Sequence, residues 1–107
     1  MAIREGWKVL REHRWSCMSV GYGGAIQYPV NKWAKPRPRC GPLTVFDSRE
    51  LAERFMWESW GYRLTIHRCQ YKPSRLRFLW ARGRGHGLRL NELPTGTRLA
   101  NAVKTLE

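Results

Sequence analysis

The stretch LTVFDSRELAERFMWESWGY, residues 43–62, carries the clearest structural signal in the sequence. A short apolar run, LTVF, leads straight into Asp47, whose carboxylate can accept a hydrogen bond from an unpaired backbone N–H at the start of a helix. Glu50, three positions on, can reach back to the backbone of Asp47 and complete a capping box. The pattern therefore predicts a strand followed at once by an N-capped helix.

The second half of this stretch has the periodicity of an amphipathic helix. Its apolar stripe consists of Leu51, Ala52, Phe55 and Met56. Gly61 stands where a left-handed residue commonly follows the end of a helix. Trp57 lies off the stripe, and two interpretations stay open: it is an exposed anchor for a partner protein, or it packs against Tyr62 at the helix end.

Alternating side chains before and after this stretch predict strands. Pro29 cannot donate to a ladder, so the strand around it lies at an edge or carries a bulge. The two runs on either side of the turn KPS, residues 72–74, predict a hairpin. The candidate strands span residues 6–12, 14–20, 25–33, 43–46, 62–71, 75–80 and 88–93.

The C-terminal stretch PTGTRLANAVKTLE, residues 94–107, predicts a second helix with Thr97 as its N-cap. Its apolar stripe at helical spacing consists of Leu99, Ala102, Val103 and Leu106. The predicted fold is therefore α+β: a mostly antiparallel sheet of about five to six strands with two helices packed on it.

Size and composition fit one domain that spans residues 1–107. The chain is 42% hydrophobic and has six tryptophans, which is enough apolar area for one core without metals or disulfides. No apolar run approaches the roughly 20 residues that span a bilayer, and the N-terminus lacks the apolar region of a signal peptide. We therefore expect a cytoplasmic protein that does not bind membranes.

The cysteines and histidines show no pattern of a metal site or an active site. Cys17, Cys40 and Cys69 are an odd number at wide spacing, which argues against a disulfide framework. His67 and Cys69 would share one face of a strand, but a closed structural zinc site takes four ligands. His67 and His86 have no orienting partner nearby in the sequence. We expect no metal, no cofactor and no catalytic residue.

Charge is the strongest functional signal. Twenty Lys and Arg against eight Asp and Glu give a formal net charge of +12. Two windows, residues 13–46 and 59–91, contain no acidic residue. Charge that is segregated in this way makes a field that attracts polyanions, and a basic chain of this kind favours nucleic acid as the partner.

Two basic segments within these windows are predicted to bind. The proline-rich segment, residues 32–39, interleaves cations with a tryptophan, which suits single-stranded nucleic acid because bases stack on rings while phosphates meet charges. The arginine-rich segment, residues 72–84, offers forked guanidinium donors. The predicted site residues are Lys32, Trp33, Lys35, Arg37 and Arg39 in the first segment and Lys72, Arg75, Arg77, Arg82 and Arg84 in the second.

Each segment also has a plainer interpretation. The arginines are consistent with a solvated strand face and a surface loop of a basic protein, and Trp33 with a cap over the core at the end of a strand. Binding by both segments requires that the fold bring them to one face.

The chain resembles a group of small uncharacterised single-domain proteins of bacteriophage, archaeal-virus and environmental sequences. Four segments, in this order along the chain, carry the resemblance: SCMSV, IQYPVNKW, GPLTVFDSRELAERF and LPTGTRLANAVKTLE. The resemblance spans residues 7–106 and implies a viral origin, but it implies no activity. With the charge pattern, it predicts a small basic protein that associates electrostatically with nucleic acid without strong sequence preference. A protein that binds a host protein, as an inhibitor does, is the first alternative.

A second alternative rests on a weaker resemblance. GPLTVFDSRELAERF by itself is similar to one core segment of ADP-ribosyltransferase-type folds. That family uses an early basic or histidine residue and a late catalytic glutamate, which would fall on Arg11 or His13 and on Glu92. The resemblance implies a small or degenerate ADP-ribosyltransferase-like domain.

Overall fold

The computed structural model describes residues 2–17, 25–58, 63–80 and 87–107. Along the chain its elements are β1 (Arg4–Leu10), the 3-10 turn η1 (Glu12–Arg14), β2 (Trp33–Ala34), β3 (Leu43–Phe46), α1 (Arg49–Glu58), β4 (Thr65–Pro73), β5 (Phe78–Leu79), β6 (Leu88–Arg89), the 3-10 turn η3 (Leu90–Glu92) and β7 (Thr97–Thr105).

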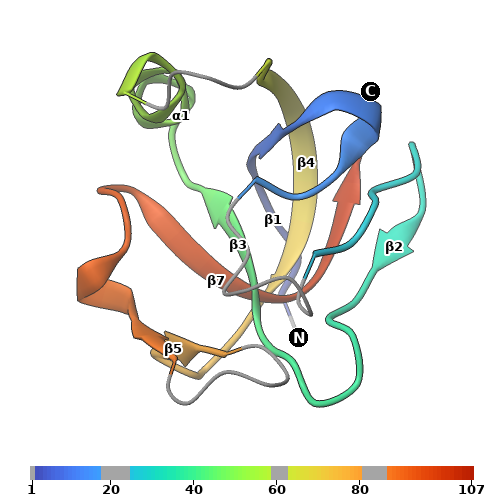
Figure 1. Cartoon of the computed structure of the whole chain (residues 1–107). Coiled ribbons are helices and arrows are strands. Elements are labelled where there is room, and N and C mark those ends of the chain that lie inside the picture. The colour runs from blue at the N-terminus through green and yellow to red at the C-terminus, as the bar shows by residue number, and fades with distance from the viewer. Residues whose placement is uncertain (1, 18–24, 59–62, 81–86) are drawn as a thin grey trace.

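Four antiparallel strands close into a small barrel (Figure 1). β3, β1 and β4 are neighbours in the wall, and β7 closes it because its first half pairs with β3 and its second half with β4. β2 is added beside β7, with Trp33 opposite Lys104. β5 and β6 form a separate two-stranded sheet, in which Phe78 pairs with Arg89.

Three apolar clusters hold these elements together. The first fills the barrel and includes the fully buried Val103. The second lies under α1, where Phe46 packs with Ala52. The third joins the β5–β6 sheet to the barrel through Leu79 and Leu99. Each large apolar side chain that is buried in this way stabilises the fold by about 1.5–3 kcal/mol relative to exposure.

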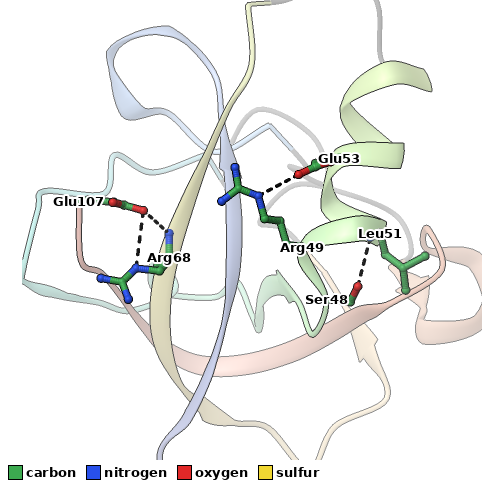
Figure 2. A network of polar contacts seen from close by, with 6 residues as sticks. All are labelled: Ser48, Arg49, Leu51, Glu53, Arg68 and Glu107. Carbon is green, nitrogen blue, oxygen red and sulfur yellow. Dashed lines mark hydrogen bonds and ion pairs between the residues drawn. The ribbon is translucent and has the colours of Figure 1, made fainter.

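Helix α1 is confirmed, but its cap is not the predicted one. The Oγ of Ser48 accepts a hydrogen bond from the N–H of Leu51 at 3.3 Å (Figure 2), so Ser48 is the N-cap. Asp47 instead forms an ion pair with Arg98 of β7 at 2.9 Å. The predicted capping box is therefore wrong, because the third helical position is Leu51 and not Glu50.

The predicted α+β fold with two helices packed on a sheet is wrong. The described residues contain one α-helix, and residues 97–105, expected in the second helix, form β7. The pairing of β7 with β4 skips Asn101, which is a bulge. Ala100 and Val103, which both face the barrel core, are therefore three positions apart, as on a helix face, although the chain is extended.

The predicted hairpin between residues 62–71 and 75–80 is also wrong. β4 lies between β1 and β7, and β5 pairs with β6 instead. The residues KPS do not join two paired strands, because β4 pairs with β1 and β7, which come from distant parts of the chain. The strands predicted at residues 6–12 and 43–46 are confirmed as β1 and β3, shifted at β1 by two residues at each end.

The remaining candidate strands are partly seen. Around residues 14–20 and 25–33, the described residues form isolated bridges, such as the one between Trp15 and Gln27, and the short β2. Residues 18–24 lie outside the described part of the chain, as does the predicted helix end at Gly61. The strand predicted at residues 88–93 ends early, because η3 follows β6 directly.

Candidate nucleic-acid interface

The proline-rich segment contains β2 and continues into the loop that leads to β3. Lys32, Lys35, Arg37 and Arg39 are all exposed. A turn shapes its second half, because the N–H of Cys40 donates to the carbonyl of Arg37 at 2.9 Å and Arg39 has a positive φ of 66°. Lys32 therefore lies directly before β2, and the other three cations extend from a short loop that is anchored by β2 on one side and β3 on the other.

Trp33 lies on the outside of the barrel. Its neighbour Ala34 packs against the barrel cluster, whereas Trp33 belongs to none of the three clusters and is half-buried. The Nζ of Lys72 lies 4.8 Å from the centroid of the Trp33 ring, and the Nζ of Lys104 lies 5.2 Å from it. Each such cation–π contact stabilises by about 0.5–1 kcal/mol at an exposed site. The ring is thus held among cations at the surface.

Two contacts join the two basic segments. Near their start, Trp33 meets Lys72. Two residues beyond the proline-rich segment, Gly41 forms a bridge with Trp80 of the arginine-rich segment, with two backbone hydrogen bonds of 3.1 and 2.7 Å. The proline-rich segment and residues 72–80 thus extend between the same pair of contacts, and the structure brings these parts of the two predicted segments together. Arg82 and Arg84 lie outside the described residues.

The β5–β6 sheet adds a concave surface to this region. Arg75 and Arg77 are exposed where the chain enters it. An open hollow of about 620 Å³, hereafter the β5–β6 hollow, is lined by Arg77, Phe78, Gly87, Arg89, Leu90 and Asn91. Glycine is required at position 87, because a Cβ there would lie 2.1 Å from the carbonyl oxygen of Leu79. The described residues of this lining include two guanidinium groups and no carboxylate.

The ion pairs of the described residues lie elsewhere. They join Arg49 to Glu53, Arg54 to Glu58, Arg63 to Glu12, Arg68 to Glu107 and Arg98 to Asp47. Figure 2 shows one of the two pairs on α1, between Arg49 and Glu53, and the pair between Arg68 and Glu107 at the C-terminus. Within the described part of the chain, no predicted site residue takes part in an ion pair, so no carboxylate there neutralises these cations.

Three residues of this surface are not among the predicted site residues. Lys104 is missed because residues 97–106 read as a helix, which hides its pairing with Trp33. Phe78 and Arg89 face each other across β5 and β6, and this pairing is visible only once β5 is separated from β4. The acid-free window that contains both residues is the one signal in the sequence that points to them.

One further cation lies inside the barrel. Lys8 is 3% exposed, and its Nζ donates to the carbonyl oxygen of Thr44 at 2.6 Å. The same Nζ lies 4.7 Å from the centroid of the Tyr28 ring. A buried ammonium is costly unless it is paired or hydrogen-bonded. Here a carbonyl and an aromatic ring compensate it, which makes Lys8 a structural residue of the barrel.

The buried thiol and the imidazole also have structural surroundings. Burial raises the pKa of the Cys69 thiol to about 12, so the thiol is protonated at neutral pH and is a poor nucleophile. Burial, followed by the charge of Arg14, lowers the pKa of His67, whose ring contacts the hydroxyl of Thr65 at 2.7 Å. Among the described residues, no group of three or more His, Cys, Asp or Glu could hold a metal ion.

The positions implied by the ADP-ribosyltransferase resemblance have local contacts. The Nε of Arg11 donates to the carbonyl of Ser16 at 2.9 Å, and His13 is exposed. The carboxylate of Glu92 accepts a hydrogen bond from the N–H of Arg89 at 3.0 Å. The resemblance stays a prediction, as does the viral origin.

Comparison of the chain with protein-family models, with curated proteins and with solved structures finds no match in any of the three. Among the described residues, no helix has the length and apolar character needed to cross a membrane.

Proposed function

We propose that the protein binds nucleic acid through its two basic segments, mainly by contacts with phosphates and without strong sequence preference. The observation that supports this function is the meeting of the segments at the Trp33–Lys72 contact and at the Gly41–Trp80 bridge. The exposed cations between these contacts have no carboxylate partner among the described residues. Such cations neutralise phosphates and carry no sequence information by themselves.

The charge of this surface sets the expected dependence on salt. Neutralising about six phosphates releases counterions and gives a slope of log affinity against log salt of about −5 on duplex and about −4 on a single strand. The aromatic rings of Trp33 and Phe78 lie among the cations, where bases of a single strand can stack on them. The contacts with phosphates and the stacking of bases therefore depend on the same surface.

The test is a titration of fluorescently labelled single- and double-stranded oligonucleotides with the whole protein at about 50 and about 300 mM salt. We expect binding at the lower salt and a loss of about a thousandfold in affinity at the higher one. Absence of binding at both salt concentrations contradicts the proposal, and so does an affinity that salt leaves unchanged.

A second candidate function is binding to a host protein through α1. Trp57 on this helix is 84% exposed, and a large exposed aromatic side chain is a frequent anchor at protein interfaces. The charges beside it on α1 are paired with each other, so salt should affect this binding little. The variant Trp57→Ala should abolish such a complex and leave the affinity for oligonucleotides unchanged.

A further inference from the structure

We propose that the β5–β6 hollow holds one unstacked base of a single-stranded nucleic acid, with Arg77 and Arg89 at the neighbouring phosphates. This inference rests on the proposed nucleic-acid binding and adds the class of ligand, a single strand in place of a duplex. It also extends the binding surface beyond the two segments, since Arg89 and Asn91 come from the chain after β5.

The ring of Phe78 is placed for stacking. Phe78 is 47% exposed and lies directly opposite Arg89, so the two side chains share one face of the β5–β6 sheet. Leu79 and Leu88, the next pair, pack into the third apolar cluster instead. The ring of Trp80 lies 5.3 Å from that of Phe78, centroid to centroid, and supports it. An exposed ring that is held by a neighbour loses little freedom when a base stacks on it.

The charges around the hollow suit the phosphates on either side of a base. Arg77 and Arg89 come from two adjacent parts of the sheet, which are joined where the N–H of Leu90 donates to the carbonyl of Arg77 at 2.7 Å. The carboxylate of Glu92 accepts a hydrogen bond from the backbone N–H of Arg89 at 3.0 Å, but Glu92 lines a different hollow together with Glu58. Among the described lining residues, two guanidinium groups are therefore available to phosphates, and no carboxylate is present.

The shape and the polar lining fit a nucleotide. The volume of about 620 Å³ lies within the range of about 300–1,000 Å³ that is usual for small-molecule sites. The amide of Asn91 offers both a donor and an acceptor to the edge of a base. In a duplex the faces of the bases are covered by their neighbours, so a ring at the surface can stack only on a base of a single strand.

The experiment compares three labelled ligands of equal length at about 50 mM salt: a thymidine oligonucleotide, an abasic oligonucleotide with the same sugar–phosphate chain, and a duplex. We expect the thymidine strand to bind about tenfold more tightly than the abasic strand. The variant Phe78→Ala should remove the part of this difference that comes from stacking in the hollow, keep the part that comes from Trp33, and leave the affinity for the abasic strand unchanged. The double variant Arg77→Gln with Arg89→Gln should weaken the binding of both strands.

Two further variants separate stacking from loss of structure. Phe78→Leu keeps an apolar side chain at the β5–β6 sheet and should reduce the preference for thymidine as Phe78→Ala does. Trp57→Ala removes an exposed aromatic ring at the other end of the molecule and should keep the preference. Thermal unfolding of each variant reports whether the fold is retained.

The outcomes distinguish this inference from the proposed function. Equal affinity for thymidine and abasic strands overturns the base site and leaves the phosphate binding intact. Duplex binding as tight as that of the thymidine strand also overturns the base site. Absence of binding to all three ligands overturns both proposals.

Discussion

The end of the barrel that carries α1 and the end that carries β5 use charge in different ways (Figure 1). Two ion pairs lie along α1, and a third joins Asp47, directly before the helix, to Arg98. At the other end, Arg37, Arg39 and Arg77 are exposed without a carboxylate partner among the described residues.

The position of the carboxylates, more than the net charge, therefore determines which surface we expect to bind a polyanion. Exposed ion pairs stabilise a fold by about 0–1 kcal/mol each, so the pairs near α1 contribute little stability. They do cancel the field on that side of the molecule. A polyanion should therefore meet the β5 end, although arginines are found at both ends.

The largest expected effect concerns the aromatic rings of the two ends. Phe46, under α1, is 1% exposed, and Phe46→Ala should lower the free energy of unfolding by about 3–5 kcal/mol because it leaves a cavity. Phe78 is 47% exposed, and Phe78→Ala should lower it by less than about 1 kcal/mol. Urea denaturation measures both values. Similar losses would mean that the β5–β6 sheet is a core element and not an open surface.

The next effect concerns charge at the two ends. Replacement of Arg37, Arg39, Arg77 and Arg89 by Gln should reduce the salt slope on a single strand by about three and the affinity at about 50 mM salt by roughly a hundredfold. Fluorescence anisotropy with labelled oligonucleotides measures both quantities.

The matched control replaces Arg49, Arg54, Arg63 and Arg68 by Gln. It lowers the net charge by the same amount but removes arginines that are ion-paired. We expect a change in affinity of less than about threefold, because the carboxylates left behind lie away from the bound strand. Equal losses in the two variants would show that total charge alone determines binding.

A smaller effect lies in the barrel between the two ends. The pKa of Cys69 is about 12 in the folded protein, against an ordinary value of 9.0. Above pH 9 the unfolded thiol loses its proton while the folded one keeps it, so stability falls as the pH rises from about 9 to about 12. The slope from this group is at most about 1.4 kcal/mol per pH unit.

Urea denaturation at several pH values in this range should show that the free energy of unfolding falls less steeply with pH in Cys69→Ala than in the unmodified protein. Burial also raises the pKa of Tyr28 and of Tyr71, so part of the decline should remain. Cys40→Ala, which removes a thiol from the third apolar cluster, is the control and should keep the full slope. An unchanged slope in Cys69→Ala contradicts the assignment.

The smallest effects test the start of α1. Ser48→Ala removes the N-cap and should lower the free energy of unfolding by about 1 kcal/mol. Asp47→Asn removes only the exposed ion pair with Arg98 and should lower it by about 0.2–1 kcal/mol. Thermal and urea unfolding compare the two. A larger loss in Asp47→Asn, which keeps a side chain able to cap, would mean that the ion pair with Arg98 stabilises the fold more than the Ser48 cap does.

Local patterns predicted part of the fold well. The alternation in β1 and the apolar run of β3 are strand signals that need no knowledge of the partner strand. Helix α1 is encoded by its own stripe, which packs against Phe46. The cap was misplaced by one residue, because Asp47 and Ser48 are both good N-caps and the ion pair with Arg98 selects between them.

The candidate site was predicted in part because the exposure of some of its residues is also a local property. The exposure of Arg37, Arg39 and Arg77 follows from their charge, which no distant contact alters. Lys104 and Arg89 join the surface only through strand pairing, with Trp33 and Phe78 respectively. No local pattern carries that information.

By itself, the sequence determined the segregation of charge and the elements whose signals are local, namely β1, β3 and α1. The tertiary structure decided that β7 is a strand, since it pairs along both edges and packs on both faces, and its bulge at Asn101 reproduces the spacing of a helix. The pairing of strands also brought Lys104 beside Trp33 and Arg89 beside Phe78. The physical reason is that closing a barrel depends on hydrogen bonds between residues far apart in the chain, and these override local preference.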